Sequence, residues 1–226
     1  VLYGLVMFAL GQVLGRMVWG AGFGGHMHGS LFGASRHTGA GEALTWAAYN
    51  FITLALIPYL YFRNKGYSNA ALSLTSANPR NDWIIILVVG SVGVITDLLI
   101  GNLLTLSGRQ LRIGIPLAFV IGLLGTGLPV MVFIYSILLP RYARLTNSTL
   151  MTVLLGGVTY ASFHLFDSWT AYTSVPNVLL SIIFVFFQFF GPGMLKAYLT
   201  LRTGNAWVHL WAYHATSPHV TVDTPL

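Results

Sequence analysis

The feature that most constrains this chain is a succession of apolar runs, each about as long as a membrane is thick. Residues 114–139, GIPLAFVIGLLGTGLPVMVFIYSILL, contain no charged side chain. A helix needs about 20 predominantly apolar residues to cross the hydrocarbon core of a bilayer. Only helices and closed barrels satisfy their backbone hydrogen bonds in lipid, and these runs are too long and continuous for barrel strands. We therefore expect an all-α chain that crosses the membrane several times.

Seven membrane segments are predicted, of which the last is short. They cover residues 1–20, 43–62, 83–106, 114–139, 149–166, 177–200 and 205–217. Charged residues make up only 7% of the 226 positions, against about 25% in soluble domains. The sequence thus predicts a polytopic integral membrane protein, a helical bundle forming a single domain over residues 1–226, with the lipid bilayer as its first partner.

Several function classes are excluded by what the chain lacks. It contains no cysteine, which excludes disulfides, thiolate nucleophiles and cysteine-ligated metal centres. The P-loop, GxSxG and HExxH patterns are also absent. The net charge of +6 comes with no nucleic-acid-binding pattern, so we expect no nucleic-acid partner. Any cofactor would be held by histidine, carboxylate or backbone groups.

The basic residues are unevenly divided between the two sets of loops. The first set consists of Arg63, Lys65, Arg80, Arg141, Arg144, Lys196 and Arg202; the second consists of Arg36, Arg109 and Arg112. Cytoplasmic loops of membrane proteins carry an excess of Lys and Arg. The seven-to-three balance therefore predicts that the first set faces the cytoplasm, in an inner or cytoplasmic membrane.

Histidines gather on the opposite side. The glycine-rich loop over residues 21–42 contains His26, His28 and His37, while His164 and the last segment approach the same side; only His209 is expected to lie deeper. His26, His28 and His209 are candidate ligands for haem, chlorophyll or a metal. A loop rich in glycine, serine and histidine is also typical of a simple solvated connection.

The last two histidine-bearing segments suggest a second possible site. His164 and Asp167 lie about 60° apart on a helix, so HLFD can present an imidazole and a carboxylate on one face. With His214 and His219 they would form a nitrogen and oxygen ligand set suited to zinc, iron or copper. His209 and His214 are about 140° apart on a regular helix and cannot face one target. Structural roles for each histidine remain the alternative.

The stretch SILLPRYARLTNSTLMTVLLGGVTYASFHLF resembles the CPBP or Abi family, which comprises the CAAX prenyl proteases and bacteriocin-processing intramembrane endopeptidases. In that family a Glu-Glu-x-x-x-Arg motif precedes such a helix end, and the next helix closes with Phe-x-x-x-His. Tyr160 and His164 occupy the positions of this second motif. The final NAWVHLWAYHA resembles the helix of the third motif, His-x-x-x-Asn, with His214 at its histidine. The resemblance covers about residues 43–219.

The resemblance lacks its catalytic base. Counting back from Pro140, the family glutamates fall at Val130 and Met131 and the arginine at Tyr135. The asparagine of the third motif falls at Pro218. In the family, a glutamate activates water for attack on a peptide carbonyl, which needs a proton acceptor within hydrogen-bond reach. Valine and methionine cannot supply one, so the resemblance implies a catalytically degenerate relative.

Few carboxylates are left to replace that base. The chain contains five, at Glu42, Asp82, Asp97, Asp167 and Asp223. We expect Asp82 and Asp223 to be solvated and Glu42 to favour the N-terminal dipole of a helix. An ionisable residue at membrane depth, such as Asp97, is a functional candidate by default, although pairing with Arg16 or a histidine would make it structural.

Three hypotheses for the function follow. The first is a degenerate CPBP-like membrane protein that serves as a scaffold or accessory subunit for other membrane proteins, with or without a cofactor bound through histidine. The second is an active intramembrane endopeptidase in which Glu42 or Asp97 serves as a relocated base. The third is a haem-, chlorophyll- or metal-binding subunit of an energy-converting complex.

Overall fold

The structure is a computed structural model that describes residues 2–4, 6–7, 10–11, 40–100, 107–165 and 172–214. Within these ranges every regular element is a helix, which confirms the all-α prediction, and the single backbone bridge, between Leu74 and Asn205, belongs to no strand. The elements, with η marking π-helices, are α3 (Ala40–Asn50), η1 (Phe51–Leu56), α4 (Ile57–Asn64), α5 (Pro79–Ile100), η3 (Gln110–Gly114), α6 (Ile115–Gly122), η4 (Leu123–Gly127), η5 (Val130–Leu138), α7 (Leu139–Thr146), α8 (Thr149–Ser162), α9 (Val175–Thr203), α10 (Ala206–His209) and η6 (Leu210–His214).

Four continuous helices are long and apolar enough to cross a membrane. They are Ala43–Asn64, Pro79–Thr96, Leu111–Thr146 and Val175–Thr203, and they match four of the predicted segments. The predicted segment at 149–166 forms α8, whose 14 residues reach about 21 Å at 1.5 Å per residue, less than the roughly 30 Å of a hydrocarbon core. The segment at 205–217 is shorter still, and residues 1–20 lie mostly outside the described ranges. Four helices of this kind agree with an integral membrane protein.

Proline explains where the long helices change their winding. The π-helical stretches η1, η3, η4 and η5 each end two residues before a proline, namely Pro58, Pro116, Pro129 and Pro140. Proline has no N–H for the carbonyl four residues earlier and its ring crowds that turn. A π-helical turn before the proline reduces this crowding, because its hydrogen bonds span five residues instead of four. Two such bonds run from Ile57 N–H to Ile52 O and from Leu139 N–H to Ile134 O. The helices therefore continue through their prolines instead of ending at them.

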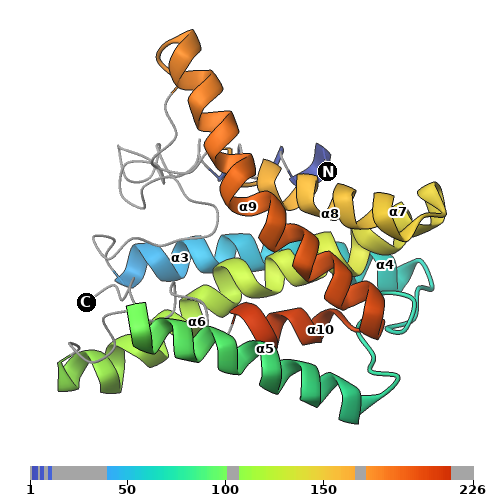
Figure 1. Cartoon of the computed structure of the whole chain (residues 1–226), viewed down its shortest axis with the longest axis horizontal. Helices are drawn as coiled ribbons and strands as arrows, with labels where there is room; N and C mark the ends of the chain where they lie inside the picture. Colours follow the sequence, from blue (N-terminus) through green and yellow to red (C-terminus); the bar gives the residue numbers. More distant parts are fainter. Residues whose placement is uncertain are drawn as a thin grey trace.

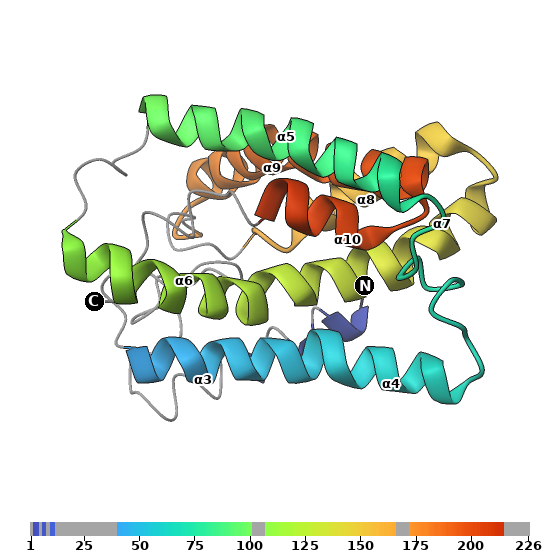
Figure 2. The same cartoon turned by 90° about the horizontal axis from the view of Figure 1, so that it is seen from below.

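The π-helix η5 forms the centre of the bundle. All residues from Val130 to Ile137 are buried, and η5 contacts η1, α4, α8, α9 and α10. Figure 2 shows the long helix that contains α6 and α7 running between α3–α4 on one side and α5–α10 on the other. Around it, α9 crosses the other long helices at a steep angle (Figure 1). Side chains that point inward from α8, α9 and α10 thus converge on η5.

Three connections meet at one end of the bundle (Figure 2). The α4–α5 connection reaches the α9–α10 turn, where Ala206 N donates to Ser73 O at 2.7 Å, and Arg141 of α7 lies over the ring of Phe62 at the end of α4. Six described basic residues belong to this basic end: Arg63, Lys65, Arg80, Arg141, Arg144 and Arg202. Arg109 and Arg112 precede α6 at the opposite end. Among the described residues, the loops that carry the first predicted set lie at one end, but the placement of Lys196 among them is wrong, because Lys196 is fully buried within α9. Arg36 of the second set lies outside the described residues.

Candidate functional site

The first feature of the site is the close approach of α8 and α9. A Cβ added to Gly193 would lie 2.8 Å from Tyr160 Cβ and 3.0 Å from Gly157 Cα. One added to Gly156 would lie 2.7 Å from Ala197 Cβ. Small residues at helix interfaces in membranes allow the backbones to approach in this way. The contact brings Tyr160 of α8 against the turn of α9 that contains Lys196.

Lys196 is the most unusual buried group among the described residues. Its side chain is 0% exposed, and its amine has no hydrogen-bond partner among the described atoms. The Nζ atom lies 3.7 Å from the centroid of the Tyr160 ring and 4.5 Å from that of Tyr213. An ammonium over an aromatic face gains up to about 2 kcal/mol when both are desolvated. The faces of these two rings therefore lie against the Lys196 amine.

His209 and Tyr135 form the next part of the cluster. Their ring centroids are 4.4 Å apart, and the Tyr135 hydroxyl donates to Gly193 O at 3.2 Å. Thr200 Oγ1 lies 3.4 Å from His209 Nδ1 and gives its single hydrogen to Lys196 O at 2.9 Å. Because the hydroxyl has one hydrogen, Thr200 Oγ1 is the acceptor in its contact with His209 Nδ1.

His164 lies just beyond the end of α8 and is also buried. Its ring stacks on Phe189 with centroids 3.5 Å apart and planes 3° from parallel, and it meets Tyr160 edge-on at 5.0 Å. The backbone N–H of His164 donates to Ala161 O at 2.9 Å. Tyr160 and His164, which the resemblance pairs, are thus neighbours in space. We call the residues Tyr135, Tyr160, His164, Lys196, Thr200, His209 and Tyr213 the Lys196 cluster.

The two positions at which the resemblance expects glutamates belong to the hydrophobic core. Val130 and Met131 are each 1% exposed and lie within the main cluster of buried apolar residues. Tyr135, where the resemblance expects an arginine, packs its ring on His209. The Lys196 cluster itself offers one amine, three phenols, a hydroxyl and two imidazoles. None of its members is a carboxylate, so a glutamate-activated water has no counterpart in it.

The remaining predicted site residues are only partly described. The structure brings His209 and His164 into the same cluster, with His164 against the ring of Tyr160 and His209 against the ring of Tyr135. His26, His28, His37, Asp167 and His219 lie outside the described residues, as do the side chains of Glu42, Asp97 and His214. No group of three possible metal ligands occurs among the residues that are described. Leu210–His214 is π-helical, so the angle expected for a regular helix between His209 and His214 does not apply there.

Asp82 is buried rather than solvated, which corrects the prediction. It is 4% exposed, and its Oδ2 accepts hydrogen bonds from Ser76 Oγ at 2.6 Å and Asn205 Nδ2 at 2.9 Å. Asn205 also caps α10, because its Oδ1 accepts from Trp207 N at 3.1 Å. Asp82 therefore joins the α4–α5 connection to the start of the helix that bears His209. The sequence places Asp82 among basic residues, which hides this structural role.

Lys196 is the functional candidate that the sequence interpretation missed. The distribution of basic residues groups it with Arg202 in the loop at the end of the predicted segment 177–200. The available signal was its position within the continuous apolar helix Val175–Thr203. Ionisable side chains at membrane depth are rare and mark functional positions by default.

The chain was compared with protein-family models, curated proteins and solved structures. The chain matches no protein-family model, no curated protein and no solved structure.

Proposed function

We infer that the chain is a catalytically degenerate, CPBP-like integral membrane protein that serves as a scaffold or accessory subunit in a larger membrane complex. The observation that carries this proposal is the burial of Val130 and Met131 in the apolar core, at the positions where the resemblance expects glutamates. Peptide hydrolysis by activated water needs a base of suitable pKa next to that water. The apolar side chains at these two positions supply no base, and their burial keeps them out of contact with solvent.

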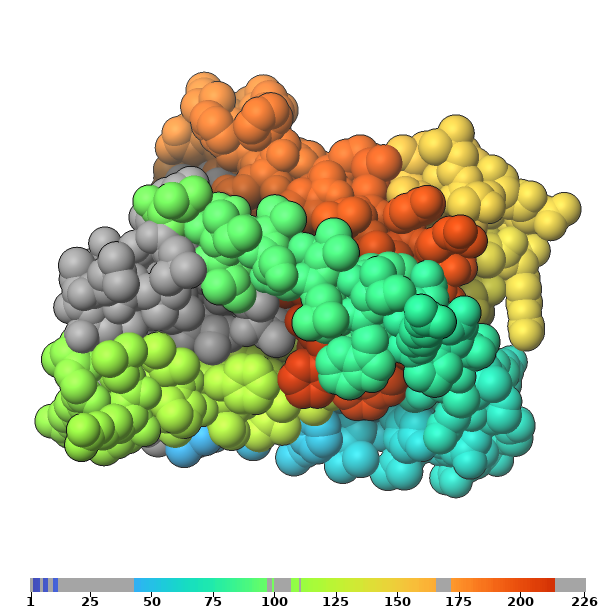
Figure 3. Space-filling view, turned by 60° about the horizontal axis from the view of Figure 1, so that its bottom comes forward, coloured from blue at the N-terminus to red at the C-terminus, as the bar shows by residue number. Residues whose placement is uncertain are grey.

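The outer surface of the bundle supports the second part of the proposal. The spans α5 and α9 bury a smaller share of their residues than the other two candidate spans. Phe187 of α9 is 87% exposed and Leu99 of α5 is 79% exposed. Figure 3 shows α5 lying across the front of the molecule in green, with α9 beyond it in orange. Such faces suit contact with lipid and with helices of partner proteins, and the positive-inside rule orients the basic end toward the cytoplasm.

The Lys196 cluster has a structural role in this proposal. It joins η5, α8, α9 and the α10–η6 helix through ring contacts and hydrogen bonds. Buried polar groups that are held in place favour one arrangement of the helices over others. A scaffold needs such a fixed arrangement because its partners recognise the outer helix faces.

Peptide hydrolysis assays test the proposal. We expect the purified chain, in detergent micelles with a fluorogenic peptide library, to give no hydrolysis above that of His164→Ala and Glu42→Ala variants. Hydrolysis by the wild type that either change abolishes would refute the proposal and support a relocated base. The same samples test the cofactor extension, because haem or chlorophyll absorbs visible light and a bound metal is detected by elemental analysis.

A further inference from the structure

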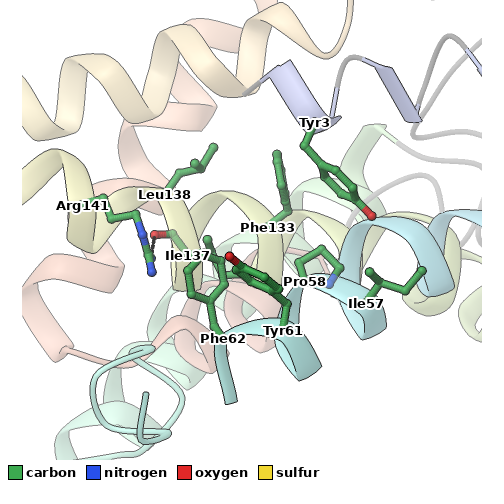
Figure 4. Close-up of a pocket in the computed structure, with 9 residues that line it drawn as sticks. All are labelled: Tyr3, Ile57, Pro58, Tyr61, Phe62, Phe133, Ile137, Leu138 and Arg141. Carbon is green, nitrogen blue, oxygen red and sulfur yellow. Dashed lines mark hydrogen bonds between the residues drawn. The ribbon is translucent and has the colours of Figure 1, made fainter. Parts of the chain in front are cut away.

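An apolar pocket opens between α4 and η5 near the basic end of the bundle (Figure 4). Its volume is about 440 Å³, within the roughly 300–1,000 Å³ that is usual for ligand sites. Ile57, Pro58 and Phe62 line it from α4, while Phe133 and Ile137 line it from η5. These side chains present carbon atoms to the pocket, which suits a hydrocarbon chain and disfavours a polar solute.

One residue of the pocket lining is a cation. Arg141, at the start of α7, lines the same pocket. Its guanidinium carbon lies 4.0 Å from the ring centroid of Phe62, and its Nη1 donates to Ile137 O. Its Nη2 is shielded and has no hydrogen-bond partner among the described atoms. A shielded donor without a partner is unfavourable, and an anionic acceptor that reached it would remove that cost.

Further positive charge lies beside this end of the pocket. Arg63 Nη1 donates to Tyr67 O at 2.7 Å, and the ring of Tyr67 lies 5.1 Å from the Arg141 guanidinium carbon. Lys65 Nζ lies 5.7 Å from the ring of Tyr61, which lines the pocket. The pocket therefore joins an apolar length to a cluster of cations, which is the charge pattern of an anionic lipid. Basic pockets between membrane helices on the cytoplasmic side bind the headgroups of such lipids.

We propose that the α4–η5 pocket binds one acyl chain of an anionic phospholipid from the adjacent leaflet, with the lipid phosphate held by Arg141. The guanidinium suits this role because Nη2 can donate a charge-assisted hydrogen bond to a phosphate oxygen while Nη1 keeps its bond to Ile137 O. The acyl chain would lie against Ile57, Phe133 and Ile137. A zwitterionic lipid of the same chain length would fill the pocket but would gain less from the cations at its end.

Native mass spectrometry of the full chain in detergent micelles tests the proposal. Phosphatidylglycerol and phosphatidylcholine with identical acyl chains are titrated separately against the wild type, Arg141→Gln, Ile57→Trp and Arg144→Gln. Arg144 is the matched control, because it is an exposed cation on α7 that does not line the pocket. Ile57 lies partly exposed at the pocket, so a tryptophan there fills the space without entering the main core.

The expected result is one tightly bound phosphatidylglycerol, preferred about tenfold over phosphatidylcholine, which corresponds to one charge-assisted contact. Arg141→Gln removes this preference, Arg144→Gln keeps it, and Ile57→Trp weakens binding of both lipids. Equal losses in the two arginine variants would overturn the proposal, since they indicate general surface charge. Displacement of the lipid by inorganic phosphate alone, or equal binding of both lipids by the wild type, would also overturn it. If Arg141→Gln does not fold, the wild-type preference and Ile57→Trp decide the question.

Discussion

Replacing Gly193 with alanine is expected to separate α8 from α9 and to weaken the Lys196 cluster. The new methyl group would lie 2.8 Å from Tyr160 Cβ and 3.0 Å from Gly157 Cα, and neither atom can move without its helix backbone. Overpacking of this kind typically costs about 1–3 kcal/mol. Alanine also gains about 1 kcal/mol of helix propensity over glycine, which would mask part of the loss.

Gly122→Ala is the matched control. Gly122 ends α6 with helical backbone angles, and an added Cβ there would meet no atom within 4 Å. The propensity gain is common to both variants, so their difference in unfolding free energy isolates the packing term, about 1–3 kcal/mol. The assay is unfolding by sodium dodecyl sulfate in mixed micelles, followed by circular dichroism. Equal stability of the two variants would refute the close packing of α8 and α9 on which the site is built.

Three further predictions concern other contacts. The two lysines of the chain differ in access, so an amine-reactive label is expected to modify exposed Lys65 and spare Lys196 until the protein unfolds; equal labelling, measured by peptide mass spectrometry, would contradict the burial of Lys196. Asp82→Ala removes the acceptor of Ser76 and Asn205, and we expect a loss of about 2 kcal/mol in the same unfolding assay, whereas an unchanged midpoint would exclude that link. Gly125→Ala would place a methyl group 2.4 Å from the Trp46 ring and is expected to be less stable than Gly122→Ala, which meets no neighbour; the reverse order would be inconsistent with the packing of α3 on η4.

The membrane helices could be predicted from the sequence because lipid imposes one dominant rule. A run such as 177–200 must form a helix, since the bilayer offers its backbone no hydrogen-bond partner, and the structure has Val175–Thr203 there. The π-helical stretches could not be predicted in the same way. They depend on whether a helix continues through Pro58 or Pro129, and that is decided by the neighbours that hold both ends of the helix in place.

The candidate site was predicted only where it coincides with the resemblance. Tyr160 and His164 share one helix end, so their proximity follows from local spacing. The contacts of Lys196 with Tyr160 and Tyr213 depend instead on the angle between α9 and its neighbours, which no local pattern encodes. The prediction that Asp82 is solvated fails for a related reason. Its sequence neighbours are hydrophilic, but its hydrogen-bond partner Asn205 is distant in the sequence.

The central claim is tested most directly by isolating the tagged chain from its native membrane in a mild detergent and measuring the mass and composition of the particle. The scaffold account predicts that the chain is recovered with one or more membrane proteins at a fixed molar ratio, retained through successive chromatography steps. Recovery of the chain as a single polypeptide, at the mass of one copy with its detergent, would contradict that account.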